Sequence, residues 1–439
     1  MNLLFEIAGF NLLYPVQVLL GFTYYYPLFM AYLWMLGALW FYCRYELGQP
    51  NTIRLLNNPK VSIVVPCFNE EAHVREVIGH LMGMHYPNYE VIAVNDGSTD
   101  KTGSILEELA GLYPRLRVIH QATNQGKAVG LNTAAFLADS DYIIGIDGDA
   151  LLDHDAIPLF LQHFISSPRV GAVTGNPRIR TRSTLLGRLQ VGEFSSLVGL
   201  IKRAQRVFYR QLFTASGVIT AFRKSAIEDV GYWSQDMLTE DMDITWKLQL
   251  RGWDVRFEPR ALAWILMPET IRGLWKQRLR WAMGGLQIIA KYKGIIRNWR
   301  NYPVWPLFFE HVLSVVWACS VCIVLAAYCV DLLEGMYLWL FLGGAGTTAA
   351  VSSMTALLPE YSGVIIGSTC LLQMLLSLLM DRRYDHQLMR YYLWTIWYPF
   401  GFWIVNMLTI IVAIPKTLLR KRGLRARWIS PDRGVTLKL

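Results

Sequence analysis

Charged side chains are scarce in this chain. Asp, Glu, Lys and Arg supply 17% of the 439 residues, whereas soluble domains carry about 25%. Hydrophobic residues make up 53% and aromatic residues 13%, which excludes a disordered chain because disorder needs charge and few aromatics. Since Trp and Tyr gather at membrane interfaces, this composition indicates a protein that meets a membrane.

Two common phosphate-binding loops are absent. No GxGxxG follows the first predicted strand, and the run at 97–102 lacks the second glycine of a P-loop. Gly126-Lys127 is followed by Ala128 instead of Ser or Thr. A dinucleotide-dependent dehydrogenase and a P-loop ATPase are therefore disfavoured.

Cysteine is also rare, with six residues in the chain. Cys319 and Cys322 form a CxxC, but no second pair stands nearby to complete a zinc site. Most of the cysteines lie in apolar runs, so we interpret them as packing residues. Nothing in their pattern demands an oxidising compartment.

Positive charge, by contrast, is in excess, with a formal net charge of +9. Nucleic-acid binding is one interpretation, and the anchoring of membrane segments on the cytoplasmic side is the other. Residues 416–439 hold eight Lys and Arg against the single acid Asp432. This clustering favours the membrane interpretation.

Long apolar stretches lie at both ends of the chain. Those at 3–22 and 24–43 are each near the ~20 residues that a spanning helix needs, although Glu6 could keep the first in the interface. The first basic residue is Arg44, so the basic start of a signal peptide is missing. Later spans are predicted at 307–330, ending at 371–380, and at 392–414, with 337–358 open as a span or a surface segment.

The charges near the last span conflict. Arg382, Arg383, Arg390 and the basic tail all favour the cytoplasm, yet one predicted span separates them. The tail has the larger excess and is placed inside, and Pro399 could kink the span. The chain divides into membrane segments at 1–45, a cytoplasmic domain at 46–300, transmembrane helices at 301–416 and a basic tail at 417–439.

The middle of the chain alternates between short apolar runs and amphipathic stretches. Alternation of this kind predicts an α/β domain with a mostly parallel sheet. The expected strands are 61–66, 90–94, 116–120 and 142–146, and the expected helices are 70–83, 102–112 and 127–138. Ligands of such sheets bind beyond the carboxyl ends of the strands, where Asn69, Asp96 and Asp147 stand.

Asp147-Gly148-Asp149 places two carboxylates on one tight turn. Such a pair suits a divalent cation that also grips a diphosphate, although an isolated pair is more often a solvated turn. Asp96 ends a neighbouring strand and points at the same crevice, which favours a site. Its ionised carboxylate only accepts hydrogen bonds, as the N–H of a uracil ring or a ribose hydroxyl requires.

Two further motifs follow in the chain. Thr239-Glu240-Asp241 could supply a base for a sugar hydroxyl, or could simply be a capped helix start. Gln277, Arg280 and Trp281 share one helical face, where the Arg suits pyrophosphate and the Trp a sugar ring. The alternative for this segment is an amphipathic helix that lies at the membrane interface.

Arg178, Arg180 and Arg182 alternate along one short stretch. They either bind along an anionic or hydroxyl-rich ligand or form a solvated basic edge.

Taken in order, these motifs resemble the processive family-2 glycosyltransferases across roughly residues 60–285. That family carries a strand-end Asp, a DxD, a TED triplet and a QxxRW motif, all intact here. Longer runs narrow the resemblance to bacterial members that build β-1,6-linked poly-N-acetylglucosamine, a biofilm exopolysaccharide. These runs lie at 94–102, 146–153, 173–183, 264–270 and 425–433.

The resemblance implies a Rossmann-like catalytic domain of glycosyltransferase type A, facing the cytoplasm, within an α-helical protein of the inner membrane. It implies that Asp96 contacts the nucleotide of UDP-N-acetylglucosamine, and that Asp147 and Asp149 bind Mg²⁺ or Mn²⁺ with the diphosphate. Asp241 is then the general base of a single inverting displacement. The remaining substrate-binding positions are Lys127, Glu240, Gln277, Arg280 and Trp281.

The family resemblance also implies binding partners, and it leaves alternative functions and products open. The implied partners are the growing glycan, which the protein also helps to export, membrane lipid and a small membrane subunit with cyclic-di-GMP at the joint surface. No nucleic acid is expected, and the sequence shows no cyclic-di-GMP site. A vestigial transferase acting as a channel or scaffold would carry a broken motif. The motifs do not separate hyaluronan, chitin and cellulose as products.

Overall fold

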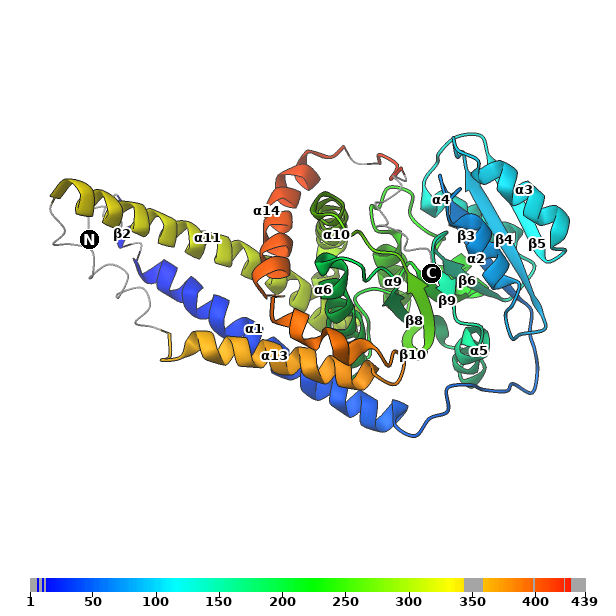
Figure 1. The fold of residues 1–439 in the computed structure, drawn as a ribbon, viewed down its shortest axis with the longest axis horizontal. Helices are drawn as coiled ribbons and strands as arrows, with labels where there is room; N and C mark the ends of the chain where they lie inside the picture. Colours follow the sequence, from blue (N-terminus) through cyan, green and yellow to red (C-terminus); the bar gives the residue numbers. More distant parts are fainter. Residues whose placement is uncertain are drawn as a thin grey trace.

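The structure, a computed structural model, describes residues 6–7, 10–11, 13–342, 358–397, 399–421 and 423–427. Figure 1 shows an α/β domain at one end and three long helices that extend away from it. Most of the open stretch 337–358 and most of the tail run 425–433 lie outside the described residues. A short strand pair, β1 (Glu6–Ile7) and β2 (Phe10–Asn11), precedes the first long helix.

An eight-stranded sheet forms the centre of the domain, in the order β5-β4-β3-β6-β9-β8-β10-β7. Neighbouring strands from β5 to β6 run parallel, as do β8 and β10, whereas β9 runs antiparallel to both its neighbours. The four predicted strands are confirmed. The strands are β3 (Val61–Cys67), β4 (Tyr89–Asp96), β5 (Leu116–Gln121), β6 (Tyr142–Ile146), β7 (Leu151–Leu152), β8 (Val170–Ile179), β9 (Ile219–Arg223) and β10 (Asp254–Ile265).

Helices cover both faces of this sheet. Alternate residues of β3 point to opposite faces: Ile63 and Val65 pack with α2 (Val74–Leu81), α3 (Thr102–Leu112) and α5 (Ala156–Ser166). Val64 packs on the other face with α4 (Lys127–Leu137), α8 (Lys224–Asp229) and α9 (Glu240–Leu250). The predicted Rossmann-like α/β class is therefore confirmed.

Four helices in the described part of the chain are long and apolar enough to cross a membrane. Figure 1 shows α1, α11 and α13 side by side along the longest axis. The four candidate spans correspond to α1 (Leu13–Phe41) with η1 (Tyr42–Glu46), α11 (Trp305–Leu342), α13 (Ser362–Asp381) and α14 (Ile404–Leu419).

The N-terminal region contains one long helix where the sequence suggested two stretches. α1 continues through Thr23, whose hydroxyl donates to the carbonyl of Leu20 at 2.8 Å. Because this polar group is satisfied inside the helix, no boundary forms there. The described residues hold a single candidate span in this region, Gln17–Glu46.

The last candidate span starts later than predicted. Residues Leu388–Trp397 form the 3-10 segment η5, η6 (Pro399–Trp403) follows, and the candidate span is Gly401–Leu419. α14 lies across the direction of the other long helices in Figure 1, beside α10 (Ile271–Tyr292). Two short 3-10 segments, η3 (Lys293–Arg297) and η4 (Trp299–Val304), connect α10 to α11.

Segments before and after α14 contact the α/β domain. Before it, Asp385 pairs with Arg182, and after it the N–H of Ala426 donates to the carbonyl of Gln235 at 2.8 Å. The two basic segments whose charges conflicted in the sequence therefore lie next to the same domain.

Buried ion pairs join the candidate membrane-spanning helices to the α/β domain. Arg203 on α7 (Ile201–Phe208) pairs with Glu46 at the end of η1 at 2.5 Å and with Asp381 at the end of α13 at 2.9 Å. Arg178 on β8 reaches Asp381 at 2.7 Å. α6 (Leu185–Glu193) and η2 (Phe194–Leu200) lead into α7. We call Glu46, Arg178, Arg203 and Asp381 the membrane joint.

The three arginines at 178, 180 and 182 do not fit either sequence interpretation. Arg178 is buried in the membrane joint, Arg180 pairs with Glu76 at 2.6 Å and Arg182 pairs with Asp385. Asp381 and Asp385 lie in the C-terminal part of the chain, so Arg178 and Arg182 dock the α/β domain onto that part, whereas Glu76 lies on α2 of the α/β domain itself.

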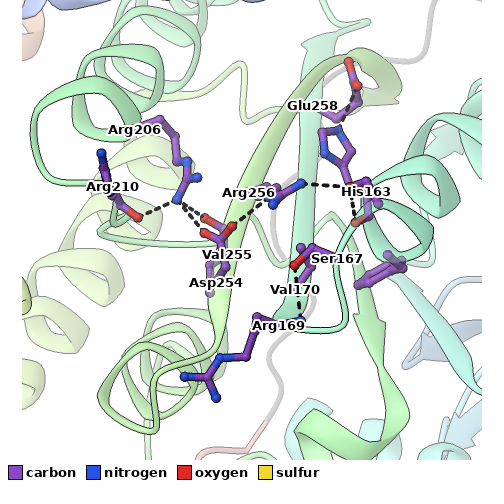
Figure 2. Close-up of polar contacts among 12 residues, drawn as sticks. His163, Ser167, Arg169, Val170, Arg206, Arg210, Asp254, Val255, Arg256 and Glu258 are labelled. Carbon is purple, nitrogen blue, oxygen red and sulfur yellow. Dashed lines mark hydrogen bonds and ion pairs between the residues drawn. The ribbon is translucent and has the colours of Figure 1, made fainter.

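A second set of charged contacts runs along β10 (Figure 2). Arg206 pairs with Asp254 at 2.9 Å, and Asp254 also accepts from Arg256 at 2.7 Å. His163 on α5 lies 3.0 Å from Glu258. These contacts fix α5 and α7 against the strand and lie away from the cavity described next.

Candidate active site

A cavity of about 1140 Å³ lies between the α/β domain and the membrane helices. It collects eight of the nine substrate-binding and catalytic residues expected from the sequence. These are Lys127 from α4, Asp147 and Asp149 after β6, Glu240 and Asp241 from α9, and Gln277, Arg280 and Trp281 from α10. Residues more than 150 positions apart in the sequence thus line the same cavity.

The Asp147-Gly148-Asp149 turn follows β6 and enters the cavity at the carboxyl end of the sheet. A side chain at Gly148 would lie 3.1 Å from the carbonyl oxygen of Pro66 and 3.2 Å from Glu70. Glycine therefore lets the turn pack closely against the end of β3, where a Cβ would be crowded. This close packing presents the two flanking carboxylates to the cavity.

Lys127 links the acidic groups. Its Nζ donates to a carboxylate oxygen of Asp147 and to the carbonyl of Gly217 at 3.0 Å, and lies 3.3 Å from Glu240. Burial opposes the charge, but the carboxylates of Asp147 and Glu240 outweigh burial and raise the pKa of Lys127. The amine is held as an ammonium between the strand end and α9.

Asp241 lies in the first turn of α9. One of its carboxylate oxygens accepts from the N–H of Gly217 at 3.1 Å, and the other from the N–H of Met242 at 2.9 Å. Burial first, and then the charge of Glu240, raises the pKa of Asp241, while Lys127 and the two N–H groups oppose this shift. The carboxylate is oriented and more basic than an exposed one.

Thr239 precedes α9 but does not cap it. Its hydroxyl makes no side-chain cap bond and has no hydrogen-bond partner among the described residues. Instead, Gly284 of α10 lies against Thr239, so closely that any side chain at 284 would overlap it. The capped-turn interpretation is wrong in this detail, because packing against α10 takes over the side chain.

α10 brings Gln277, Arg280 and Trp281 to the cavity on one face, as the i, i+3, i+4 spacing predicts. The amide oxygen of Gln277 is buried and accepts no hydrogen bond within the described chain. On the side away from the cavity, Arg278 binds Glu193 at 2.6 Å, and its guanidinium lies 4.2 Å from the Trp281 ring centroid. This buried pair fixes the orientation of the Trp281 ring.

Asp96 is the one expected residue that does not line the cavity. It is fully buried, and its two oxygens accept from the N–H groups of Gln125 at 2.7 Å and Gly126 at 2.8 Å. Burial raises the pKa of Asp96, and these two bonds oppose the shift. Asp96 thereby holds the loop that immediately precedes Lys127.

The cavity also contains basic residues that the sequence analysis missed. Arg272 and Lys276 lie eight and four positions before Arg280 on α10, a helical stripe that the spacing could have revealed. Arg420 and Arg427 arrive from beyond α14, and no local signal places them there. The cavity thus has an acidic wall from the α/β domain and a basic wall from α10.

Comparison with known proteins gives three findings. The model of Glycosyl transferase family 2 matches residues 62–231. The poly-beta-1,6-N-acetyl-D-glucosamine synthase of Staphylococcus aureus (strain COL) is 37% identical over 420 residues, which cover 95% of this chain and 98% of the relative. The Staphylococcus epidermidis protein of the same name is 35% identical over 425 residues, covering 94% and 98%.

Among solved structures, a Pyrobaculum calidifontis mannosyltransferase in complex with GDP-Man and Mn²⁺ is similar along 93% of this chain and 99% of its own. The TM-score is 0.60 and the sequence identity 20%. This likeness concerns the fold.

Proposed function

The chain belongs to glycosyltransferase family 2, as a hexosyltransferase related to bacterial polysaccharide synthases, and we propose that it polymerises N-acetylglucosamine from UDP-N-acetylglucosamine into a β-1,6-linked glycan. The names of relatives that match nearly the whole chain support this product. The observation that carries the proposal is the cavity, where four carboxylates face a stripe of basic side chains. A sugar diphosphate and an acceptor hydroxyl need both walls.

Asp241 is the proposed general base. The oxygen of an acceptor hydroxyl attacks the anomeric carbon of the donor sugar, whose bond to the diphosphate oxygen breaks. UDP leaves with the bonding electrons, and the hydroxyl proton passes to Asp241. A positioned base contributes roughly 10²–10⁴-fold to such a step. One displacement inverts the anomeric carbon, so the reaction needs no nucleophile from the enzyme.

Basic side chains would hold the diphosphate during this step. Arg280 offers planar donors that match phosphate oxygens, and Lys127 and Lys276 lie on the same cavity. Trp281, fixed by Arg278 and Glu193, offers a flat face for an acceptor sugar. The unpartnered amide oxygen of Gln277 would accept a sugar or ribose hydroxyl.

A divalent cation fits the acidic wall. Asp147 and Asp149 both face the cavity, and the described residues contain no group of three or more His, Cys, Asp or Glu arranged to hold a metal. Two carboxylates therefore leave room for diphosphate oxygens and water, as Mg²⁺ requires. When bound, the cation stabilises charge on the leaving diphosphate. Mn²⁺, present with GDP-Man in the related mannosyltransferase, has the same ligand preference.

The nucleotide site would lie beside Asp96. Because Asp96 holds the N–H groups of Gln125 and Gly126, it sets the loop that carries Lys127 into the cavity. We place the uridine at this strand end, where Asp96 contributes by holding the loop at Gln125 and Gly126.

Export through the same chain is supported by where the cavity ends. Its lining includes Tyr26 and Trp34 of α1, and Glu310 and Ser314 of α11. Aromatic and hydroxyl-bearing side chains suit the flat, hydroxyl-rich faces of a glycan. A growing chain could thus pass from Asp241 toward the membrane helices.

The proposed location is the bacterial inner membrane, with the catalytic domain in the cytoplasm, where UDP-sugars are made. α1, α11 and α13 would cross the bilayer. α14 has 16 residues and spans about 24 Å, yet both its flanks contact the catalytic domain. It would therefore lie along the membrane surface, which reconciles the two basic segments with one cytoplasmic side.

A small membrane subunit, with cyclic-di-GMP at the joint surface, remains part of the proposal on family grounds. Measuring synthesis by the purified chain with and without candidate subunits tests it. Full activity of the chain alone would remove the requirement.

Linkage analysis of the product tests the central proposal. The purified full-length chain, reconstituted in lipid vesicles with Mg²⁺, should incorporate labelled sugar from UDP-N-acetylglucosamine and yield 6-linked residues. Unlabelled UDP-glucose and UDP-glucuronate should not compete. A 4-linked N-acetylglucosamine product would point to a chitin-type synthase, glucose incorporation to a cellulose type, and dependence on UDP-glucuronate to a hyaluronan type. Each of these would contradict the proposal.

A further inference from the structure

A lysine that the mechanism above does not use lies on the cavity wall. Lys202 of α7 is 5% exposed and lines the cavity. Its Nζ donates to the hydroxyl of Thr174 at 3.3 Å. Its neighbour Arg203 turns away into the membrane joint and binds two carboxylates, whereas Lys202 forms no ion pair with any described residue.

The surroundings of this amine are unfavourable for its charge. The ring centroid of Phe257 lies 5.8 Å from Nζ. Burial lowers the pKa of Lys202 to about 7, and the charge of Asp241 opposes this shift. An ammonium has three N–H donors, and one of them donates to a group among the described residues. A buried donor without a partner is unfavourable unless a ligand supplies an acceptor.

The position of Lys202 indicates which substrate would supply this hydrogen-bond acceptor. Phe194, Val198, Ile201, Lys202 and Gln205 all line the cavity, at spacings that put them on one face of the continuous η2–α7 helix. At one end of this face, Gln205 donates to Glu310 of α11 at 2.9 Å. Lys202 therefore lies next to the part of the cavity that reaches the membrane helices.

Short hydrogen-bonded steps also connect Lys202 to the catalytic carboxylate. The hydroxyl of Thr174 that binds Lys202 accepts from the N–H of Ser216 at 2.8 Å. The next N–H, that of Gly217, donates to Asp241 at 3.1 Å. Lys202 and Asp241 are thus both linked to the adjacent backbone N–H groups of Ser216 and Gly217.

We propose that Lys202 binds the end of the acceptor glycan, donating hydrogen bonds to sugar oxygens beside the hydroxyl that Asp241 deprotonates. This assignment rests on the proposed synthase function. The hydroxyl and N-acetyl carbonyl oxygens of the sugar accept hydrogen bonds from the ammonium of Lys202. These bonds orient the terminal sugar toward Asp241. The donor would be held by other residues, since Asp147, Asp149 and Arg280 form the proposed diphosphate site.

Steady-state kinetics with a soluble acceptor test this assignment. Full-length wild-type, Lys202→Met and Lys202→Arg proteins are compared using UDP-N-acetylglucosamine and a β-1,6-linked N-acetylglucosamine oligosaccharide. Lys202→Met should raise the KM for the oligosaccharide by roughly 10- to 100-fold, as loss of a charged hydrogen bond does. The KM for the nucleotide sugar and the affinity for UDP should stay within twofold, which also shows that the variant is folded. Lys202→Arg should recover most of the acceptor affinity.

Lys224→Met is the matched control. Lys224 donates to the carbonyl of Ala138 at 2.8 Å, outside the cavity, and its loss should leave both KM values unchanged. An unchanged acceptor KM in Lys202→Met, or a rise confined to the donor KM, would overturn the assignment while leaving the synthase function intact. A wild-type protein that incorporates no N-acetylglucosamine would instead contradict the proposed function and this assignment with it.

Discussion

Opposite charges are separated on the two walls of the cavity. The α/β domain contributes Asp147, Asp149, Glu240 and Asp241 around Lys127, whereas α10 contributes Arg272, Lys276 and Arg280. Like charges held close together shift each other's pKa. Burial is the largest cause of the raised pKa of Asp241, and the charge of Glu240 raises that pKa further.

Glu240→Gln tests this dependence through the pH profile. Asp241 must be deprotonated to act as a base, so kcat/KM falls as the pH drops through its pKa. Burial and Glu240 raise that pKa, which places the acid limb at higher pH than for an exposed Asp. Removing the Glu240 charge lowers the pKa, and the acid limb should move to lower pH.

The control for this experiment is Glu107→Gln, which removes an exposed carboxylate that binds His120. It should leave the profile in place. An acid limb that stays fixed in Glu240→Gln, or moves to higher pH, would show that Asp241 is not the group that titrates.

Helix packing sets the distance between the two walls. Gly284 of α10 lies directly against Thr239, and a side chain at Gly285 would lie 2.9 Å from His311 of α11. These two glycines let α10 approach α9 on one side and α11 on the other. The spacing between Asp241 and Arg280 therefore depends on the absence of a Cβ at 284.

Gly284→Ala should separate α10 from α9. The added methyl group overlaps Thr239, so the helix has to shift, and a misplacement on the ångström scale can cost about 10²-fold in rate. We expect sugar incorporation to fall at least tenfold while UDP binding persists. Gly79→Ala on α2, where a Cβ meets nothing within 4 Å, should keep full activity. Wild-type activity in Gly284→Ala would contradict the packing argument.

The membrane joint holds the spans to the domain through charges. Asp381 ends α13, is fully buried and binds both Arg178 and Arg203. Breaking one partner of a buried pair costs about 3–5 kcal/mol, because the other charge is left without a counter-ion. The joint therefore fixes how α1 and α13 sit on the catalytic domain.

Asp381→Asn should lower the melting temperature of the purified protein in detergent by roughly 5 °C or more. Asp139→Asn removes a carboxylate whose side chain is 93% exposed and which contacts Lys60, and it should melt as the wild type does. Equal melting temperatures for Asp381→Asn and wild type would show that the joint contributes nothing to stability.

Across the chain, local patterns predicted the sheet well and tertiary contacts poorly. Val61–Cys67 and Tyr142–Ile146 were predictable because strands buried on both faces form continuous apolar runs. The i, i+3, i+4 spacing of Gln277, Arg280 and Trp281 likewise placed them on one face of a helix. Eight residues of the cavity followed from motifs that the sequence carries intact.

The misses share a physical cause. Arg178 and Arg182 find their partners, Asp381 and Asp385, about 200 residues away, and no local pattern encodes such a pairing. Arg427 reaches the cavity from the far end of the chain for the same reason. Lys202 carries no motif that marks it in the sequence, and its burial distinguishes it from a solvated lysine.

The most direct test of the account replaces the catalytic carboxylate by its neutral isostere. Asp241→Asn in the full-length protein should abolish incorporation of N-acetylglucosamine from UDP-N-acetylglucosamine, by roughly 10²-fold or more, while UDP binds as tightly as to the wild type. Polymer made by Asp241→Asn at the normal rate would contradict the assignment of this cavity as the catalytic centre.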